Sequence, residues 1–409
     1  MSVRAESNAF SDAVNSRGRI RQMVRGAAFA VAVLLLWPIL PGSSTPALVP
    51  ALSPFVAVGA MVASRSVHAL AWLGLVVGLA VMVRRRLFCH WMCPVGVCTD
   101  GAGRLGRRFG RRIVWFPRLG PWIVLLTLGG AGLGFPLFLW LDPLARFAGV
   151  FDLGGQGPRL AAILSIVGLL AMLGIALLWP NAWCGRICPL GAFQDLLSAV
   201  PASCRSMMRR RRRVPTEATT ELLVPRRMLL GAAAGAACAG ATTLCGRNKP
   251  SSLRPPGAVA GPVFSGICTR CGNCIRACPS GIIERDLGAG GWTGLLTPAL
   301  RFRTDYCRED CVRCTQVCPS GALVRMSLAE KAGMRLGLPR VDMSLCLLGE
   351  DRECSLCRSR CPYEAVRYVF SEADYTLTPR IDPNKCTGCG ACEAACPTSP
   401  RKAIVVVPI

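Results

Sequence analysis

The sequence is poor in charge and in histidine. Only 17% of its 409 residues are charged and 52% are hydrophobic, whereas about a quarter of the residues of a soluble protein are charged. Its two histidines, His68 and His90, are too few for a helical bundle holding two b-type haems, which needs four. No G-x-G-x-x-G or Walker loop occurs, so no motif supports nucleotide binding. A dihaem quinol oxidase is therefore excluded, and we expect part of the chain to lie in lipid.

Cysteine, by contrast, is abundant. The chain has 24 cysteines, and sixteen of them fall into four groups of four between Cys268 and Cys396, each group ending in Cys-Pro. A disulfide scaffold of a secreted protein has no reason to repeat such a pattern. Ligation of metal by thiolates is the better interpretation.

The first and fourth groups share the spacing C-x2-C-x2-C-x3-C-P. In bacterial ferredoxins the first three thiolates of this run hold one [4Fe–4S] cluster, and the fourth ligates the neighbouring cluster. We expect the proline after the fourth cysteine to begin a helix. The eight cysteines are Cys268, Cys271, Cys274, Cys278, Cys386, Cys389, Cys392 and Cys396.

The second and third groups keep the C-x2-C-x3-C-P core but lengthen the first gap to three and to seven residues. C-x2-C pairs also bind zinc, but four successive groups with a terminal Cys-Pro are too regular for zinc, and we predict four cubanes. Because the fourth cysteine crosses over, groups must pair: either first with second and third with fourth, or first with fourth and second with third. The eight cysteines are Cys307, Cys311, Cys314, Cys318, Cys346, Cys354, Cys357 and Cys361.

The formal charge of +25 lies mainly in the N-terminal half. From Pro250 onward there are 20 Lys and Arg against 15 Asp and Glu. Each cubane with four thiolates adds about −2, so the C-terminal region is nearly neutral once four clusters are counted. Nucleic-acid binding, the usual meaning of a high pI, therefore has no support.

Four apolar stretches approach the length needed to span a bilayer, at residues 26–40, 67–83, 119–140 and 159–179. Residues 46–63 are apolar but interrupted by prolines, which indicates an interfacial or re-entrant segment. The segments flanking these stretches on one side carry 23 arginines and those on the other side three, Arg65, Arg146 and Arg159. This asymmetry predicts a cytoplasmic N-terminus, and five arginines before residue 26 do not fit a cleavable signal peptide.

A fifth, weaker apolar run at residues 228–245 follows Arg226-Arg227. It is similar to a twin-arginine export signal, with Pro225 where Ser or Thr is usual; a plain membrane helix with a basic flank is the alternative. Either carries the remaining chain across the membrane, whereas a surface helix would leave it in the cytoplasm. The predicted order is a basic N-terminus (1–25), a four-helix membrane domain (26–208), a basic linker with the fifth helix (209–249) and a four-cluster domain (250–409).

Two further cysteine motifs match at an offset of 95 residues. Cys89 and Cys93, and likewise Cys184 and Cys188, are separated by three residues and followed by Pro, Gly and Asp at the same positions. In a helix this gap places both sulfurs on one face, so two copies related by a pseudo-two-fold axis supply four thiolates. We predict a fifth [4Fe–4S] cluster at the cytoplasmic face, since a disulfide is disfavoured in a reducing cytosol. Cys98 is close enough to be a spare ligand.

With these motifs the chain resembles a fusion of two families. Residues 20–200 resemble the NapH/MauN membrane proteins through the repeated C-x3-C-P-x-G motif. Residues 225–409 resemble the NapG/MauM polyferredoxins through Arg226-Arg227, the motif at Cys268 and the seven-residue gap after Cys346. The resemblance implies an α-helical transmembrane bundle of four helices plus a fifth export or anchor helix. An α+β polyferredoxin of bacterial 2[4Fe–4S] modules follows.

The resemblance also implies a function. Such proteins are quinol dehydrogenase modules of the bacterial inner membrane, which pass electrons from the quinone pool to a periplasmic redox enzyme or cytochrome. Two other readings stay open: an accessory factor that reduces or matures a periplasmic metallo- or quinone-cofactor enzyme, and a cytoplasm-facing redox sensor. His68 is a candidate proton acceptor for quinol, or simply an interfacial polar residue. A hydrocarbon core of about 30 Å would separate the Cys89 site from periplasmic clusters, so either quinone shuttles, the site lies deeper, or its role is separate.

Overall fold

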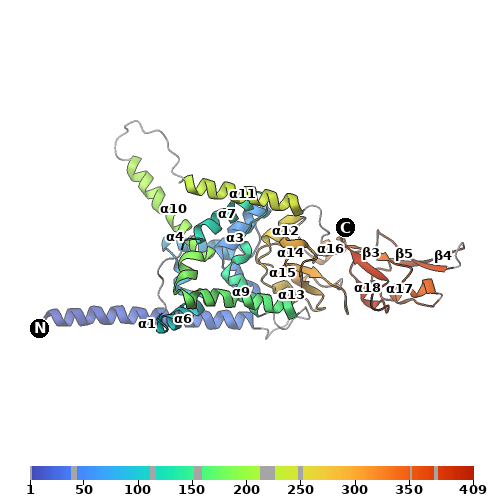
Figure 1. Cartoon of the computed structure of the whole chain (residues 1–409), viewed down its shortest axis with the longest axis horizontal. Helices are drawn as coiled ribbons and strands as arrows, with labels where there is room; N and C mark the ends of the chain where they lie inside the picture. The colour runs from blue at the N-terminus through green and yellow to red at the C-terminus, as the bar shows by residue number, and fades with distance from the viewer. Residues whose placement is uncertain are drawn as a thin grey trace.

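A computed structural model describes residues 2–37, 44–110, 117–151, 159–211, 226–246, 252–350, 352–372 and 376–409. The molecule is elongated, with a helical part (residues 2–246) at one end and a C-terminal part (residues 252–409) of short helices and small sheets at the other (Figure 1). Most of the predicted basic linker, at residues 212–225, lies outside the described residues.

The helical part consists of eleven α-helices, two short 3₁₀ helices (η1 and η2) and one π-helical turn (η3) within its described residues. Helices α1, α9 and α11 run along the long axis of the molecule (Figure 1). The elements are α1 (Ser2–Leu36), η1 (Thr45–Ala47), α2 (Leu48–Ala51), α3 (Pro54–Ser64), α4 (Ala71–Val83), α5 (Leu87–Trp91), α6 (Pro94–Arg108), α7 (Gly120–Gly132), η2 (Leu139–Leu141), α8 (Pro143–Val150), α9 (Arg159–Leu178), η3 (Trp183–Ile187), α10 (Pro189–Arg211) and α11 (Arg226–Gly246).

Two of the apolar helices, α4 and α7, are shorter than the sequence predicts, whereas α9 spans almost the whole predicted stretch. Among the described residues, only Arg226–Cys245 in α11 is long and apolar enough to cross a bilayer, and the pair Thr45–Ala51 and Pro54–Ser64, bent by 88°, would be a second span if counted as one. Helix α7 ends at Gly132 and not near residue 140, because the chain turns at Gly134 (φ +85°) ahead of Pro136. The predicted first stretch belongs to a helix that begins at Ser2. A bundle of four spanning helices is therefore not confirmed.

Where the structure describes the C-terminal part, it contains three separate two-stranded antiparallel sheets, β1–β2, β3–β6 and β4–β5. Pairing of β3 with β6, in which Leu338 lies opposite Val407, joins the end of the chain to the middle of this part. The elements are α12 (Pro262–Ile267), α13 (Asn273–Ala277), β1 (Ile283–Arg285), α14 (Gly291–Gly294), β2 (Pro298–Leu300), α15 (Arg313–Gln316), α16 (Leu328–Ala332), β3 (Leu338–Val341), η4 (Leu347–Glu350), α17 (Leu356–Ser359), β4 (Val366–Ser371), β5 (Thr376–Ile381), α18 (Ala391–Ala395) and β6 (Ile404–Val407).

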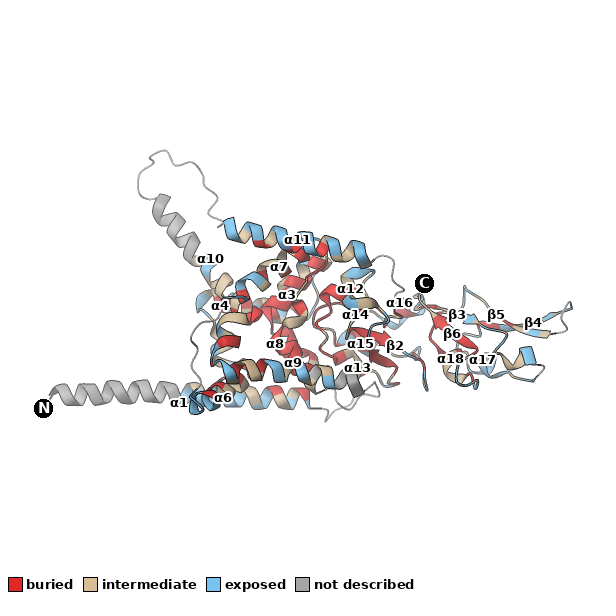
Figure 2. Cartoon of the chain, viewed as in Figure 1, coloured by how far each residue is buried: buried red, intermediate tan, exposed pale blue. Residues whose placement is uncertain are grey.

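The two parts are packed together through a continuous core, which Figure 2 shows as buried residues running from the helices into the C-terminal part. Arg276 donates to the carbonyl oxygen of Leu36 (3.1 Å). Asn273 donates to that of Pro46 (3.3 Å). A side chain at Gly266 would collide with Phe135, so this glycine permits close approach. We call this end of the helical part the docking end, and the opposite end, where Cys93 and Cys188 lie, the thiol end.

Candidate iron–sulfur sites

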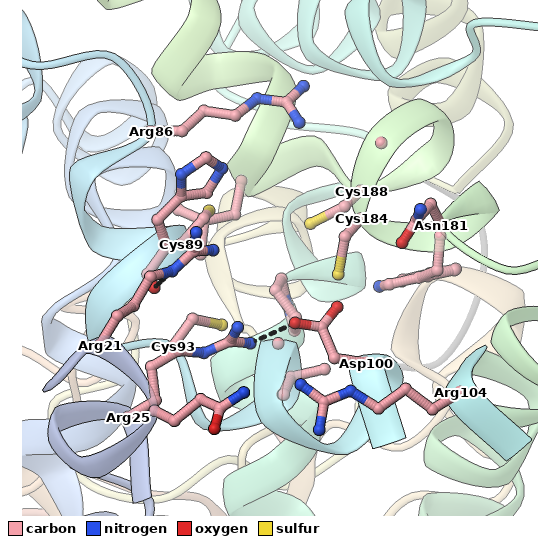
Figure 3. Close-up of a pocket in the computed structure, with 18 of the residues that line it drawn as sticks. Arg21, Arg25, Arg86, Cys89, Cys93, Asp100, Arg104, Asn181, Cys184 and Cys188 are labelled. Atoms are coloured by element: carbon pink, nitrogen blue, oxygen red, sulfur yellow. Dashed lines mark hydrogen bonds and ion pairs between the residues drawn. The ribbon is translucent and has the colours of Figure 1, made fainter. Parts of the chain in front are cut away.

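The four cysteines of the repeated motif come together at the thiol end. They line one cavity of about 630 Å³, and Figure 3 shows the sulfurs of Cys89 and Cys93 facing those of Cys184 and Cys188. Cys98 is not among the residues that line this cavity. The two copies thus contribute two thiols each to a single site.

The two copies share the backbone conformation at their start and at the second cysteine, although Cys89 lies in an α-helix (α5) and Cys184 in a π-helical turn (η3). Arg86 (φ 53°) and Asn181 (φ 67°), which are 95 residues apart, both adopt the left-handed conformation and open the two motifs. Cys93 and Cys188 are extended, with ψ of 116° and 118°, and each precedes a proline that begins the next helix. The prediction that each cysteine pair lies on one continuous helix is therefore wrong. A residue before proline is driven out of the helical region, which breaks the helix at the second cysteine.

The aspartates at equivalent positions of the two copies, Asp100 and Asp195, both form ion pairs with arginine. Asp100 accepts from Arg25 of α1 at 2.6 Å. Asp195 accepts from Arg86 at 2.5 Å and from Arg85 at 2.8 Å. Burial opposes the charge of Asp195, but the two arginines outweigh it and hold the pKa of this carboxyl below its usual range. These pairs fix the helices that carry the cysteines.

The cavity is buried and cationic. Burial raises the pKa of all four thiols, that of Cys93 to about 12. A metal must therefore displace protons when it binds there. Arg21, Arg104 and Arg107 also line the cavity, and positive charge is what a cubane with four thiolates, carrying about −2, requires. Thr99 Oγ1 lies 3.1 Å from Sγ of Cys184. The residues present fit an anionic cluster.

In the C-terminal part, the first two cysteine groups form two four-thiol sites by exchange. Cys318 of the second group lines the same cavity as the first three cysteines of the first group. In return, Cys278 of the first group lines a cavity with the first three cysteines of the second group. The sets are Cys268, Cys271, Cys274 with Cys318, and Cys307, Cys311, Cys314 with Cys278.

The last two groups exchange cysteines in the same way. Cys396 shares a cavity with Cys346, Cys354 and Cys357, and Cys361 interacts electrostatically with Cys386 and Cys389. The arrangement is therefore first with second and third with fourth, one of the two pairings that the spacing left open. Among the described residues no three His, Cys, Asp or Glu side chains converge on one metal ion; a cubane distributes its thiolates over four irons and needs them further apart.

The fourth cysteine of a group ends a helix and does not begin one, contrary to the prediction. Cys278 follows α13 and Cys396 follows α18, both with extended backbone, because a proline comes next. The chain then turns back over the sulfur. As a result Leu323 N–H donates to Cys318 Sγ and Ala365 N–H to Cys361 Sγ, each at 3.4 Å.

Comparison with known proteins agrees with this geometry. Residues 66–112 and 161–215 match a family described as "4Fe-4S binding domain", and residues 267–349 and 350–399 match one described as "4Fe-4S dicluster domain". A methylamine utilization ferredoxin-type protein MauM of Methylobacillus flagellatus is 34% identical over 181 residues, 41% of this chain and 74% of the relative. The chain belongs to the family of ferredoxin-type proteins. It is an iron–sulfur protein of electron transport.

Other relatives of this ferredoxin-type protein cover a similar share. MauM of Methylophilus methylotrophus is 38% identical over 158 residues, 36% of this chain and 66% of the relative. The ferredoxin-type protein NapG of Escherichia coli is 35% identical over 167 residues, 38% of this chain and 71% of the relative. No solved structure matches the chain.

Buried cations beside the cysteines of this ferredoxin-type protein escaped the sequence analysis. The ammonium of Lys331 is buried, donates to the carbonyl oxygen of Cys311 (2.6 Å) and acts electrostatically on Cys307. Arg270, between Cys268 and Cys271, is half-buried, with its guanidinium 5.3 Å from the Trp140 ring. The spacing of the cysteines carries no signal for Lys331, which lies in a different helix, α16.

His68 lies at the docking end. Its ring packs against Gly321, where a side chain would collide with it, and its Nε2 is 3.3 Å from Ser64 Oγ. Gly321 follows Cys318 by three residues, so His68 is close to the first four-thiol site. His90, in contrast, lines the cavity at the thiol end.

Proposed function

We propose that this ferredoxin-type protein is a membrane-anchored electron carrier that oxidises quinol and relays electrons through [4Fe–4S] clusters to a periplasmic redox enzyme or cytochrome. The observation that supports it most is that one continuous core joins a four-thiol site at the thiol end to a four-site ferredoxin at the docking end. The resemblance of residues 20–200 to the NapH/MauN membrane proteins is part of this proposal.

The proposed ligand sets follow the geometry described above. Five cubanes would be held, one at the thiol end by Cys89, Cys93, Cys184 and Cys188, and four in the C-terminal part. For three of those four clusters, the four thiols of each set line a cavity of their own. The last would use Cys361, Cys386, Cys389 and Cys392. Clusters supply one-electron redox chemistry, and the chain holds, insulates and tunes them.

The proposed location is the bacterial inner membrane, crossed several times, with the C-terminal part in the periplasm. Arginines gather at the thiol end, including Arg85, Arg86 and Arg107, which supports a cytoplasmic side for that end. The exposed apolar side chains of α4 and α11, such as Trp72, Val83 and Leu230, support contact with lipid.

Quinol oxidation can be tested in anaerobic membranes containing the full chain. Adding a quinol analogue should bleach the cluster absorbance within the mixing time, because electrons enter the oxidised clusters. An accessory factor without sustained turnover predicts intact clusters and no bleaching. That outcome, with dithionite still able to reduce the clusters, would remove the quinol dehydrogenase proposal.

The compartment is tested separately. A reporter that is active only in the periplasm, fused after Ile409, should give signal in intact cells. A cytoplasmic-type signal from the same fusion would overturn the export proposal and leave the electron-transfer proposal to the bleaching experiment.

A further inference from the structure

Helix α8 (Pro143–Val150) lies between the site at the thiol end and the first site of the C-terminal part. Pro143, its first residue, lines the four-thiol cavity. At its other end, a side chain at Gly149 would be 3.8 Å from the carbonyl oxygen of Cys271. With a rise of 1.5 Å per residue, Pro143 and Gly149 are about 9 Å apart. The two sites are therefore separated by one short helix, so in the proposed membrane location the thiol-end site lies deeper than the cytoplasmic surface of the membrane.

Helix α8 is fixed in place along its whole length. All residues from Pro143 to Gly149 are buried. The carboxylate of Asp142 caps its N-terminus, accepting from the N–H groups of Leu144 (3.0 Å) and Ala145 (3.1 Å), and Ser53 donates to the same carboxylate at 2.5 Å. At the other end, Arg285 donates to the carbonyl oxygen of Gly149 (3.4 Å).

Arg146, in the middle of α8, lies against Trp140 on the side of the first site of the C-terminal part. We call that site, formed by Cys268, Cys271, Cys274 and Cys318, the first soluble site. Arg146 donates to the carbonyl oxygen of Trp140 (2.9 Å), and its guanidinium lies 4.8 Å from the Trp140 ring. The guanidinium of Arg270 lies 5.3 Å from the same ring. Since Arg270 is between Cys268 and Cys271, the Arg146–Trp140–Arg270 stack leads from α8 directly into the cluster-binding loop.

The charges in this stack are of one sign. Arg146 interacts electrostatically with Arg270 and Arg285, and Arg270 with Cys268. Buried cations need a counter-charge, and a cubane held by four thiolates would provide about −2. Reduction adds a further negative charge to such a cluster. Cations buried beside it stabilise the reduced form and so raise its reduction potential.

We propose that α8 is the electron bridge between the thiol-end site and the first soluble site, and that its Arg146 is a positioning residue that raises the potential of the latter. This rests on the proposed function. One electron leaves the thiol-end site and one enters the site of Cys268, Cys271, Cys274 and Cys318, with no bond or proton changing hands in this step. Quinol supplies the electrons by releasing two electrons and two protons as it becomes quinone.

The potential is tested by redox titration of the anaerobic full-length protein, followed by electron paramagnetic resonance. Arg146→Gln should lower the midpoint potential of one cluster by ~59 mV, which for one electron is a tenfold change in the equilibrium constant of reduction. Arg146→Lys keeps the charge and should retain most of the potential. Arg340→Gln, which removes an exposed arginine of β3, is the control. Unchanged potentials in an Arg146→Gln protein with full iron content would overturn the assigned role of Arg146.

The bridge has a readout of its own in the unmodified protein. Two reduced clusters separated by one short helix should show magnetic interaction, which broadens both signals. If both clusters are present and their signals show no interaction, the bridge is wrong. If instead no thiol-end cluster exists, the iron content will be about sixteen per chain and not about twenty. The fifth cluster of the proposed function is then wrong. The potential shift at the first soluble site still tests Arg146 in that case.

Discussion

At the thiol end, two copies of one motif each contribute two cysteines to a single site. In the C-terminal part, one loop contributes three cysteines and a neighbouring loop contributes the fourth. The first arrangement needs both halves of the helical part before any site exists. The second makes each pair of loops a closed unit, which explains how a ferredoxin can be extended by adding pairs. The repeated unit is thus a half-site in one region and a pair of whole sites in the other.

The largest expected effect is the loss of iron when two cysteines are replaced together, and it tests this comparison directly. In Cys271→Ser with Cys318→Ser, both lost ligands belong to the same site, so we expect a loss of about four irons per chain. In Cys271→Ser with Cys278→Ser, the ligands belong to two sites, and about eight irons should be lost.

At the thiol end, Cys89→Ser with Cys188→Ser should again cost about four irons out of about twenty, and Cys98→Ser none. Iron and acid-labile sulfide analysis measures all of these. Equal losses for the two pairs that contain Cys271 would contradict the crossover.

A second, smaller effect compares a glycine in a cysteine loop of the C-terminal part, Gly388, with a glycine in the repeated motif of the helical part, Gly96. Gly388 has φ +71°, and a Cβ there would lie 2.2 Å from the carbonyl oxygen of Gly337. Gly388→Ala should therefore destabilise the fold by about 3 kcal/mol. Gly96, in α6, leaves 3.3 Å to its nearest neighbour, and Gly96→Ala should change stability by less than about 1 kcal/mol. Thermal loss of cluster absorbance compares the two; equal midpoints would remove the distinction.

The C-terminal part should contribute to acid sensitivity through Asp286, as the helical part does through Asp195. Asp286 is buried, which disfavours its charge, but Ser252 and the N–H groups of Gly288, Ala289 and Gly290 donate to it and hold its pKa below the usual range. The contribution of ionised Asp286 to the free energy of unfolding is complete above the carboxyl's pKa in the unfolded chain, about 3.9. It is lost as pH falls through the lower pKa of the folded state.

Asp286→Asn should cost about 2 kcal/mol at neutral pH and flatten the acid branch of a stability–pH profile. An acid branch as steep as in the unmodified protein would show that other groups cause it.

The smallest effect concerns the two halves of the repeat. Asp195 is bound by two arginines and Asp100 by one, and Asp100 is more exposed. Because exposed ion pairs are weak, we expect a loss of about 1 kcal/mol for Asp195→Asn and about 0.5 kcal/mol for Asp100→Asn. Midpoints of thermal unfolding in the same detergent would measure the difference. A larger loss for Asp100→Asn would mean that Arg25 does more than fix α6.

The sequence predicted the cysteine sites better than the helices around them. The spacing of cysteines is a local property of the sequence. The four loops, and the repeat of Cys89–Cys93 at Cys184–Cys188, could therefore be recognised from the sequence alone. The pairing of loops could not, because gaps of similar length permit both arrangements and the choice depends on the packing of α13 on α15 and α17 on α18.

Helix lengths were predicted less well. Apolar composition does not register a turn such as that at Gly134, nor the break before Pro94. Helix α8 gave no signal at all. It lies between the apolar stretches predicted at residues 119–140 and 159–179, and its importance comes from the two sites at its ends.

Helix α1 suggests an order of assembly. Arg25 is paired with Asp100 at the thiol end, and the carbonyl oxygen of Leu36 accepts from Arg276 at the docking end. Eleven residues separate them, about 16 Å along a helix. Because the segment of α1 from Arg25 to Leu36 is bound at both of its ends, it can pack completely only when the helical part has folded and the C-terminal part is in place. A chain whose C-terminal part has not packed should therefore leave this segment of α1 accessible to proteolysis.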